Sequence, residues 1–318
     1  MDQLPSQPGW ERELVTKLAQ ANLNEARAKR RWSIFFKLVW LSVVLAVFAY
    51  FMGWIGRGSS AAESTGRHTA LVKLEGEIAD NGKASAENIN AALAAAFRDP
   101  DSVAVVLNIN SPGGSPVQSA RIYNEIRRLR KDYQDKPIYV VVDELCASGG
   151  YFIAAAADKI YVDGSSLVGS IGVVYQGFGA DKAMEKLGIE NRTVTAGENK
   201  AFMDPFAPMK PEHKAHLEAM LADVHQQFIK AVKDGRGTRL KENTPGLFSG
   251  LIWSGSKAIE NGLVDGLGSV ESVARDIVKA EDLIDYTVEE NAFDKFARRL
   301  GTSFGAGLMQ AVNRASFK

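Results

Sequence analysis

Strand-type and helix-type segments alternate along the chain from residue 70 onward, and no other feature limits the possible folds as strongly. Short runs rich in β-branched residues occur at 70–76, 103–110, 137–143, 159–163 and 191–196. Helical patterns lie at 85–98, 116–132, 149–157, 180–187 and 211–233. This order predicts an α/β domain with a largely parallel sheet. Binding and catalytic sites of such sheets form beyond the carboxyl ends of the strands, where loops lead into helices.

Composition and charge exclude several classes of protein. The chain has 318 residues, of which 46% are hydrophobic, and this is enough for a substantial core. Its 38 basic and 38 acidic residues cancel, so no global charge favours a nucleic-acid partner. Cys146 is the single cysteine, which excludes a disulfide framework or a cysteine-based metal cluster within one chain.

An uncharged apolar segment at 38–55 predicts a transmembrane helix. As a helix it would reach about 27 Å, close to the ~30 Å hydrocarbon core of a bilayer. The nearby basic residues lie mostly on its N-terminal side, at positions 27, 29, 30, 31 and 37. This bias predicts that residues 1–37 are cytoplasmic and that the rest of the chain lies outside the cytoplasm. A cleaved signal peptide is the alternative, but the leading region is long and the apolar run is extended.

The same patterns divide the chain into five parts. They are a cytoplasmic segment at 1–37, the membrane helix at 38–55, a polar tether at 56–68, the α/β domain at 69–280 and a tail at 281–318. Residues 293–318 place apolar side chains at helical spacing among basic ones. That amphipathic pattern suits the membrane surface or a neighbouring subunit, and equally a helix packed on its own domain.

The first of two glycine loops is "NINSPGGS" at 108–115, which closes the strand at 103–110. Pro112 fixes one φ angle, and Gly113 and Gly114 can adopt dihedrals closed to other residues. Backbone N–H groups in such a loop can point inward and suit a developing oxyanion. A simple tight turn between a strand and a helix is the alternative interpretation of this loop.

The second glycine loop places Ser148 between a buried strand and an apolar helix that starts with Gly149 and Gly150. A serine at this point can be an N-cap, whose hydroxyl accepts hydrogen bonds from the first helical turn. It can also be a nucleophile, with the Gly149 N–H free to hold an oxyanion. Cys146 is two residues earlier, and we interpret it as a small buried residue because no histidine is available to form a thiolate pair.

A serine nucleophile needs a general base, and histidines are few in this chain. They are His68 in the tether and a group in one charged helical segment, His213, His216 and His225. We interpret this group as surface residues, with metal binding as the weaker alternative because nearby carboxylates lack a metal-ligand spacing. A lysine base remains, as in Ser–Lys variants of the catalytic triad. Because a free lysine has a pKa near ~10.4, such a base requires an apolar or cationic setting.

Several motifs together carry a resemblance to a known family. "NINSPGGS", "CASGGYFIAAAAD", "VGSIGV" and "GENKAFMDPF", followed by "WSGSKAIENGLVDGLGSVESV", occur in this order. Over residues 70–275 the chain resembles the signal peptide peptidase A family of serine proteases. It is most similar to the short bacterial form, which has one N-terminal anchor and one catalytic domain.

The resemblance implies a ClpP/crotonase-like fold and peptide hydrolysis by a Ser–Lys dyad, without a metal or cofactor. By motif, Ser148 corresponds to the nucleophile and Lys200 to the general base. Ser170 would orient the lysine, and Gly149 and Gly114 would supply the amides of the oxyanion hole. Spacing alone does not distinguish Lys200 from other lysines, so only the motif selects it.

The resemblance also implies the substrates and the cellular location. The substrates would be cleaved signal peptides and other apolar peptides near the membrane. The chain would be a homo-oligomer in the bacterial inner membrane, with one span, a cytoplasmic N-terminus and an extracytoplasmic catalytic domain. Three alternatives are a related Ser–Lys protease that cuts one specific partner protein, a crotonase-like enzyme acting on acyl thioesters, and an inactive scaffold.

Overall fold

The computed structural model describes residues 17, 27, 29–48 and 66–288. It divides the chain into two compact units, Met1–Ser60 with Asn291–Lys318, and Ala61–Glu290. In the first unit, Lys29–Phe48 is a helix of 20 residues with a window of mean hydropathy 1.7. Its length and composition allow it to cross a membrane, although a signal sequence near an N-terminus has the same properties. Residues 49–55 of the expected span, and the amphipathic segment at 293–318, lie outside the described residues.

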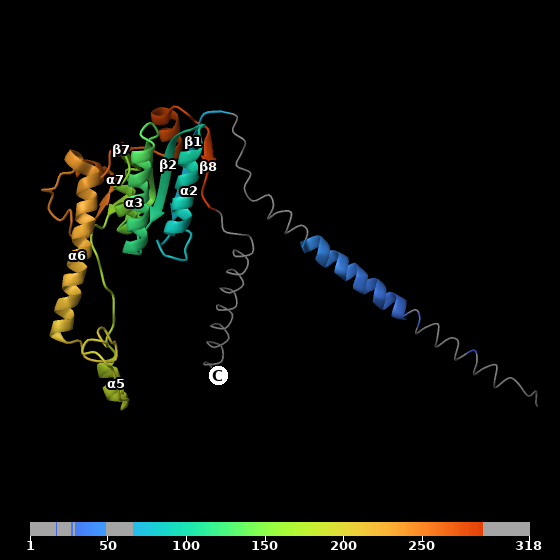
Figure 1. The fold of residues 1–318 in the computed structure, drawn as a ribbon, viewed down its shortest axis with the longest axis horizontal. Coiled ribbons are helices and arrows are strands. Elements are labelled where there is room, and N and C mark those ends of the chain that lie inside the picture. Colours follow the sequence, from blue (N-terminus) through green and yellow to red (C-terminus); the bar gives the residue numbers. More distant parts are fainter. Residues whose placement is uncertain (1–16, 18–26, 28, 49–65, 289–318) are drawn as a thin grey trace, which may run out of the picture. The chain divides into compact units, whose positions relative to one another are not determined.

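Eight strands form one sheet in the second unit (Figure 1). They are β1 (His68–Glu75), β2 (Ser102–Ser111), β3 (Ile138–Ala147), β4 (Lys159–Val162), β5 (Leu167–Gly169), β6 (Ile252–Ser254), β7 (Gly266–Leu267) and β8 (Leu283–Asp285). The order is β6-β5-β3-β2-β1-β8, with β4 paired to β3 and β7 paired to β4. Among these strands only the β5–β6 pairing is antiparallel. The predicted α/β class with a largely parallel sheet is therefore confirmed.

β3 carries two shorter strands in succession along the side opposite β2. Residues 139–142 pair with β4, and residues 145–147 pair with β5. On the other side, the register between β2 and β3 shifts between Ile109 and Ser111. The carboxyl end of β3 is thus held by β5 on one side and by the end of β2 on the other, and Ser148 follows directly.

Helices cover one face of the sheet and enclose the main core. They are α2 (Ala86–Arg98), α3 (Pro116–Asp132), α4 (Gly149–Ala154), α7 (Gly255–Glu260) and the C-terminal half of α6 (Pro211–Arg236). Ser85 and Ser115 cap α2 and α3, because their hydroxyls accept hydrogen bonds from the first helical turn. α2 and α3 lie side by side over the sheet (Figure 1).

The opposite face of the sheet is covered by a smaller cluster. Leu71, Val106, Val141 and Tyr161 are buried there against Val273. Val273 belongs to the short C-terminal helical segment formed by α8 (Val270–Ser272) and η2 (Val273–Val278). The sheet is therefore buried on both faces over its central strands, as the continuous apolar runs of parallel strands require.

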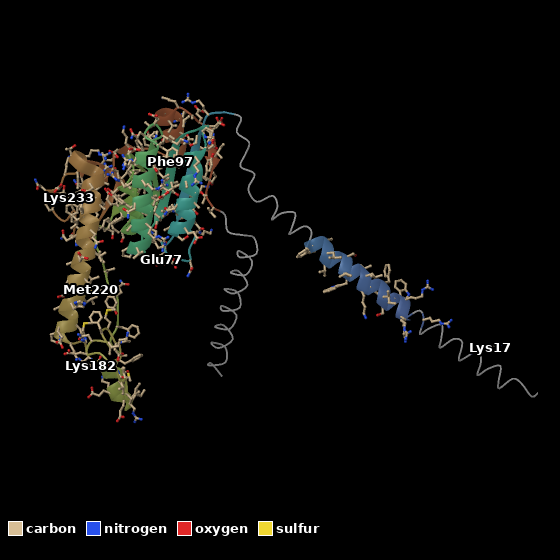
Figure 2. The ribbon with its side chains drawn as sticks, in the orientation of Figure 1. Lys17, Glu77, Phe97, Lys182, Met220 and Lys233 are labelled. Carbon is tan, nitrogen blue, oxygen red and sulfur yellow. The ribbon has the colours of Figure 1, made fainter. Side chains whose placement is uncertain are left out.

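Residues 172–222, between β5 and the C-terminal half of α6, do not pack on the sheet. This segment is termed the arm. In the view of Figure 1, the N-terminal end of α6 extends past α2 and α3, and α5 (Asp181–Leu187) is drawn below this end. Lys182 on α5 and Met220 on α6 are labelled in this region, whereas Lys233 lies at the other end of α6 (Figure 2). Apolar side chains of the arm are strongly exposed, including Phe178 at 77% and Val194 at 94%.

The strand expected at 191–196 is wrong, because this part of the arm has no strand. Asn191 Oδ1 accepts hydrogen bonds from the N–H of Thr193 at 3.0 Å and from its hydroxyl at 2.6 Å. Such local hydrogen bonds compete with the hydrogen-bond ladder between strands. In addition, no sheet surface lies beside these β-branched side chains for them to pack against.

The sheet also extends beyond the boundaries expected for the domain. His68, expected in the tether, is the fully buried first residue of β1. Its Nε2 lies 3.1 Å from the Tyr286 hydroxyl, and its Nδ1 lies 3.2 Å from the carbonyl of Gly66. β8 pairs with β1 after residue 280, so the expected tail begins with a strand of the sheet.

Candidate active site

Ser148 occupies a strained turn between β3 and α4. Its φ of 52° and ψ of −121° are unfavourable for a residue with a side chain, at a cost of about 1–3 kcal/mol. The Ser148 N–H donates to the Gly169 carbonyl, and the Ser148 carbonyl accepts from the Phe152 N–H, both at 2.9 Å. The Ser148 hydroxyl makes no capping hydrogen bond. The N-cap interpretation is therefore wrong, and the turn presents a hydroxyl that the helix does not use.

The first glycine loop lies directly against this turn. A side chain on Gly113 would place its Cβ 2.7 Å from the Ser148 Cβ and 2.6 Å from the Gly149 nitrogen. Gly113 also has a φ of +96°, a conformation that favours glycine. Its carbonyl accepts from the Ile78 N–H, and the Ile78 carbonyl accepts from the Ser115 N–H, both at 2.8 Å. The backbone of residue 78 thus holds the loop against Ser148.

Two amide N–H groups meet beside the serine. A Cβ on Gly149 would lie 3.3 Å from the Gly114 nitrogen, so the two glycine backbones are close together. Neither the Gly114 N–H nor the Gly149 N–H donates a hydrogen bond within the described part of the chain. Two unpaired donors next to one hydroxyl are an arrangement that suits an oxyanion.

Ser170 directly follows β5, the strand that neighbours the end of β3. β3 and β5 are parallel, and Ala147 is in register with Gly169, so the two serines follow at the same edge of the sheet. Ser170 also has a positive φ, 51°, and its N–H donates to the Leu251 carbonyl at 2.8 Å. The structure therefore brings together Ser148, Ser170 and the two glycine amides.

Lys200 lies elsewhere in the same chain, on the arm. Its neighbour Asn199 is hydrogen-bonded to His213, at the N-terminal end of α6. The helix that follows Ser148 contacts α6 much farther along, where the rings of Phe152 and Phe228 are 5.2 Å apart. At 1.5 Å per residue, the distance along α6 from residue 213 to residue 228 is about 22 Å. Lys200 is exposed and makes no hydrogen bond to either serine among the described residues.

Buried side chains behind the turn hold α4 in place. Tyr151 is fully buried and donates to the Leu263 carbonyl at 2.7 Å. Cys146 is fully buried in β3, and burial raises the pKa of its thiol, so it remains protonated near neutral pH. Ser119 of α3 lies beneath Gly149, where a Cβ would meet its Oγ at 2.4 Å. A side chain at position 149 would displace this Ser119 hydroxyl, which donates to the Ser115 carbonyl at 2.9 Å.

Sequence reasoning missed several residues that shape the site. Ile78 has no distinguishing local signal, because its role depends on a bridge to Gly114 across the fold. Two of the histidines interpreted as surface residues make hydrogen bonds, His213 to Asn199 and His225 to the Ile171 carbonyl, both at 3.1 Å. Among the described residues, no group of three or more His, Cys, Asp or Glu side chains could hold a metal ion.

Two family profiles match this chain. The profile of Peptidase family S49 matches residues 130–283, and that of Clp protease matches residues 65–165. A provisionally named protease of Methanocaldococcus jannaschii is 35% identical over 221 residues, which cover 68% of this chain and 70% of that protein. The chain belongs to peptidase family S49. The predicted resemblance and the ClpP-like fold are thereby confirmed.

Other relatives of this S49 chain differ in how much of their length it covers. A protein of Enterococcus faecium, provisionally named signal peptide peptidase SppA, is 34% identical over 233 residues, 69% of this chain and 66% of that protein. A Brucella abortus protein named Na+/H+ antiporter NhaA is 45% identical over 210 residues, 64% of this chain. The chain spans only 28% of that protein, so most of the protein that bears the antiporter name has no counterpart here.

Proposed function

We propose that this chain is a membrane-anchored serine endopeptidase in which Ser148 is the nucleophile and Lys200 is the general base. The observation that supports this most is the strained Ser148 turn, whose hydroxyl caps no helix and lies beside two unpaired amides. A strained turn between a strand and a helix is a recurrent way to expose a nucleophile. Membership of family S49 supports peptide bonds as the substrate.

In the proposed mechanism, the Ser148 hydroxyl attacks the scissile carbonyl carbon while its proton passes to the neutral amine of Lys200. The N–H groups of Gly114 and Gly149 stabilise the negative oxygen of the tetrahedral intermediate. The lysine then returns the proton to the leaving amine, and water hydrolyses the acyl-enzyme by the same steps. Ser170, next to Ser148, would orient the lysine amine by accepting its hydrogen bond.

A second copy of the chain would supply Lys200 to Ser148. The arm carries Lys200 away from the serine of its own chain, along about 22 Å of α6. It also exposes apolar side chains, with Val174 at 74%, Phe178 at 77% and Leu187 at 74%. Exposed apolar side chains grouped on one segment mark an interaction surface. A homo-oligomer in which each arm packs on a neighbour would bury these side chains and complete the dyad.

The substrates are proposed to be apolar peptides close to the membrane, such as remnant signal peptides. The helix Lys29–Phe48 would anchor the catalytic domain at the membrane surface where these peptides emerge. Basic residues at its start favour a cytoplasmic N-terminus and an extracytoplasmic catalytic domain. In a bacterium, this topology corresponds to the inner membrane.

Hydrolysis of a fluorogenic apolar peptide by the detergent-solubilised full chain tests the proposal. We expect Ser148→Ala and Lys200→Ala each to lower kcat by at least about 1,000-fold, because each removes a group that acts on the reacting atoms. Ser165→Ala and Lys186→Ala, both at exposed positions, are matched controls and should retain the parent rate. A Lys200→Ala variant with the parent rate would reject the dyad.

A further inference from the structure

The loop that carries Lys200 is a compact turn. The Lys200 N–H donates to the Gly197 carbonyl at 3.1 Å, and the Phe202 N–H donates to the Asn199 carbonyl at 3.0 Å. Met203 closes the turn with a φ of 67°, which is uncommon for a residue with a side chain. Lys200 is exposed, whereas Phe202 is half-buried. The turn therefore points one side chain into solvent and packs another against the protein.

α6 supplies the surface on which this turn packs. The Phe202 ring contacts two histidines of α6, with centroid distances of 5.4 Å to His213 and 5.5 Å to His216. Both contacts are edge-on, at 79° and 72°. His213 Nε2 lies 3.1 Å from Asn199 Oδ1, to which it donates in its Nε2–H form. Asn199, Phe202, His213 and His216 are termed the histidine clamp, which attaches the turn to α6 through the two residues that flank Lys200 and Ala201.

The far end of α6 is fixed to the body of the domain. Residues 213 and 231 are 18 positions apart, which is five turns of 3.6 residues, so the clamp lies on the same stripe as Ala231. Ala231 is 7% exposed, and a Cβ on Gly235 would lie 1.9 Å from the Ala155 carbonyl oxygen. One stripe of α6 is therefore packed closely on α4 at one end and holds the Lys200 turn at the other.

We propose that the histidine clamp positions Lys200 for catalysis, an inference that rests on the proposed function of Lys200 as the base. Its members do not touch the substrate or the reacting atoms. They act through the backbone of the 197–203 turn, by fixing it to a helix that is anchored in the core. A lysine on an unsupported exposed turn would sample many positions, whereas a general base must stay within hydrogen-bond reach of its serine.

The inference predicts a specific kinetic defect. Phe202→Ala removes the ring that both histidines contact, and His213→Ala removes the hydrogen bond to Asn199. Because displacements near 1 Å can lower rates about 100-fold, we expect each variant to reduce kcat by about 10- to 100-fold with little change in KM. Conservative replacements should restore most of the rate: Phe202→Tyr retains an aromatic ring, and His213→Gln retains a donor for Asn199.

A matched control and a second readout separate positioning from folding. Lys214→Ala changes an exposed residue next to His213. Lys214 forms an exposed ion pair with Glu218 at 3.7 Å, so its loss should leave kcat unchanged. Hydrogen–deuterium exchange of the peptide that contains 197–203 should accelerate in Phe202→Ala and His213→Ala, and stay at the parent rate in Lys214→Ala. Exchange elsewhere in α2 and α3 should match the parent, which excludes general unfolding.

The kinetic and exchange results together test both the histidine clamp and the proposed function of Lys200. Parent values of both kcat and exchange in Phe202→Ala and His213→Ala would overturn the clamp, even if Lys200→Ala abolishes hydrolysis. Faster exchange with an unchanged kcat would show that the clamp orders the turn but does not position the base, which also overturns the inference. If Lys200→Ala itself retains the parent rate, the proposed function fails, and the clamp loses its catalytic role with it.

Discussion

At the scale of single residues, Gly114 places the sharpest limit on the candidate oxyanion site. Its φ is +149°, and a Cβ there would lie 2.2 Å from the Ile78 carbonyl oxygen. We expect Gly114→Ala to push the loop away from Ser148 and to lower kcat by about 100- to 1,000-fold, as the loss of one oxyanion donor does. The clash should also lower the free energy of unfolding by about 1–3 kcal/mol. Peptide hydrolysis and urea denaturation measure the two effects.

Gly188→Ala is the matched control for this prediction. Gly188 has a φ of +67°, but no heavy atom lies within 4 Å of the position that its Cβ would take. The substitution should therefore lower stability by about 1 kcal/mol through backbone strain alone and leave kcat unchanged. A Gly114→Ala variant that behaves like Gly188→Ala would show that the Gly114 amide has no part in catalysis.

At the scale of elements, the C-terminus of α6 is fixed by a buried ion pair. Arg236 is 1% exposed and donates to Asp265 Oδ2 at 2.7 Å and to the Gly262 carbonyl at 2.9 Å. Burial by itself raises the pKa of Asp265, but the hydrogen bond and charge of Arg236, with Arg239, lower it below the usual 3.8. The carboxylate therefore stabilises the fold above pH 3.8, and this contribution is lost as pH falls through the lower folded-state pKa.

Asp265→Asn tests this pair in urea denaturation at two pH values. At pH 7 we expect the free energy of unfolding to fall by about 3–5 kcal/mol, because the substitution leaves a buried guanidinium without its counter-charge. Below about pH 3.8 the difference between parent and variant should shrink, since the parent also loses its carboxylate charge. Asp276→Asn, which breaks the exposed pair with Arg275, should have little effect at either pH. An equal loss of unfolding free energy in both variants would show that the buried Arg236 pair stabilises the fold no more than an exposed pair does.

At the scale of the whole molecule, the position of Lys200 predicts a mixing experiment. Ser148→Ala and Lys200→Ala chains are each expected to be inactive, but a mixed oligomer can combine the intact serine of one with the intact lysine of the other. With random exchange and equal amounts, about a quarter of the sites would be complete, so about a quarter of the parent activity should return. Subunit exchange is verified with chains that carry different affinity tags, and the rate is measured on the apolar peptide.

The control mixture pairs Ser148→Ala with a Ser148→Ala, Lys200→Ala double variant, which contains no intact serine and should stay inactive. If the first mixture also stays inactive after verified exchange, each serine must use the lysine of its own chain. The arm would then have to bend back toward Ser148, and the proposal of a shared site would be wrong.

The features that depend on short-range patterns can be predicted from the amino-acid sequence. Continuous apolar runs between helical patterns predicted the parallel core strands, because strands buried on both faces need apolar side chains throughout. The motifs selected Ser148, Gly149, Gly114 and Ser170, and glycine is needed at position 114 because the backbone of Ile78 leaves no room for a Cβ. Strands such as β5–β8, of two or three residues, were missed because they are too short to carry a pattern.

The other features follow from the folded arrangement, because they depend on contacts between residues far apart in the chain. The bridge from Ile78 to Gly114 and the pairing of β8 with β1 have no local signal. The β-branched segment at 191–196 has strand propensity but no sheet surface against which to pack, so it remains irregular. Likewise, His213 was expected on a solvated face and instead holds the turn of Lys200, since α6 extends beyond the core and only the fold places that turn beside it.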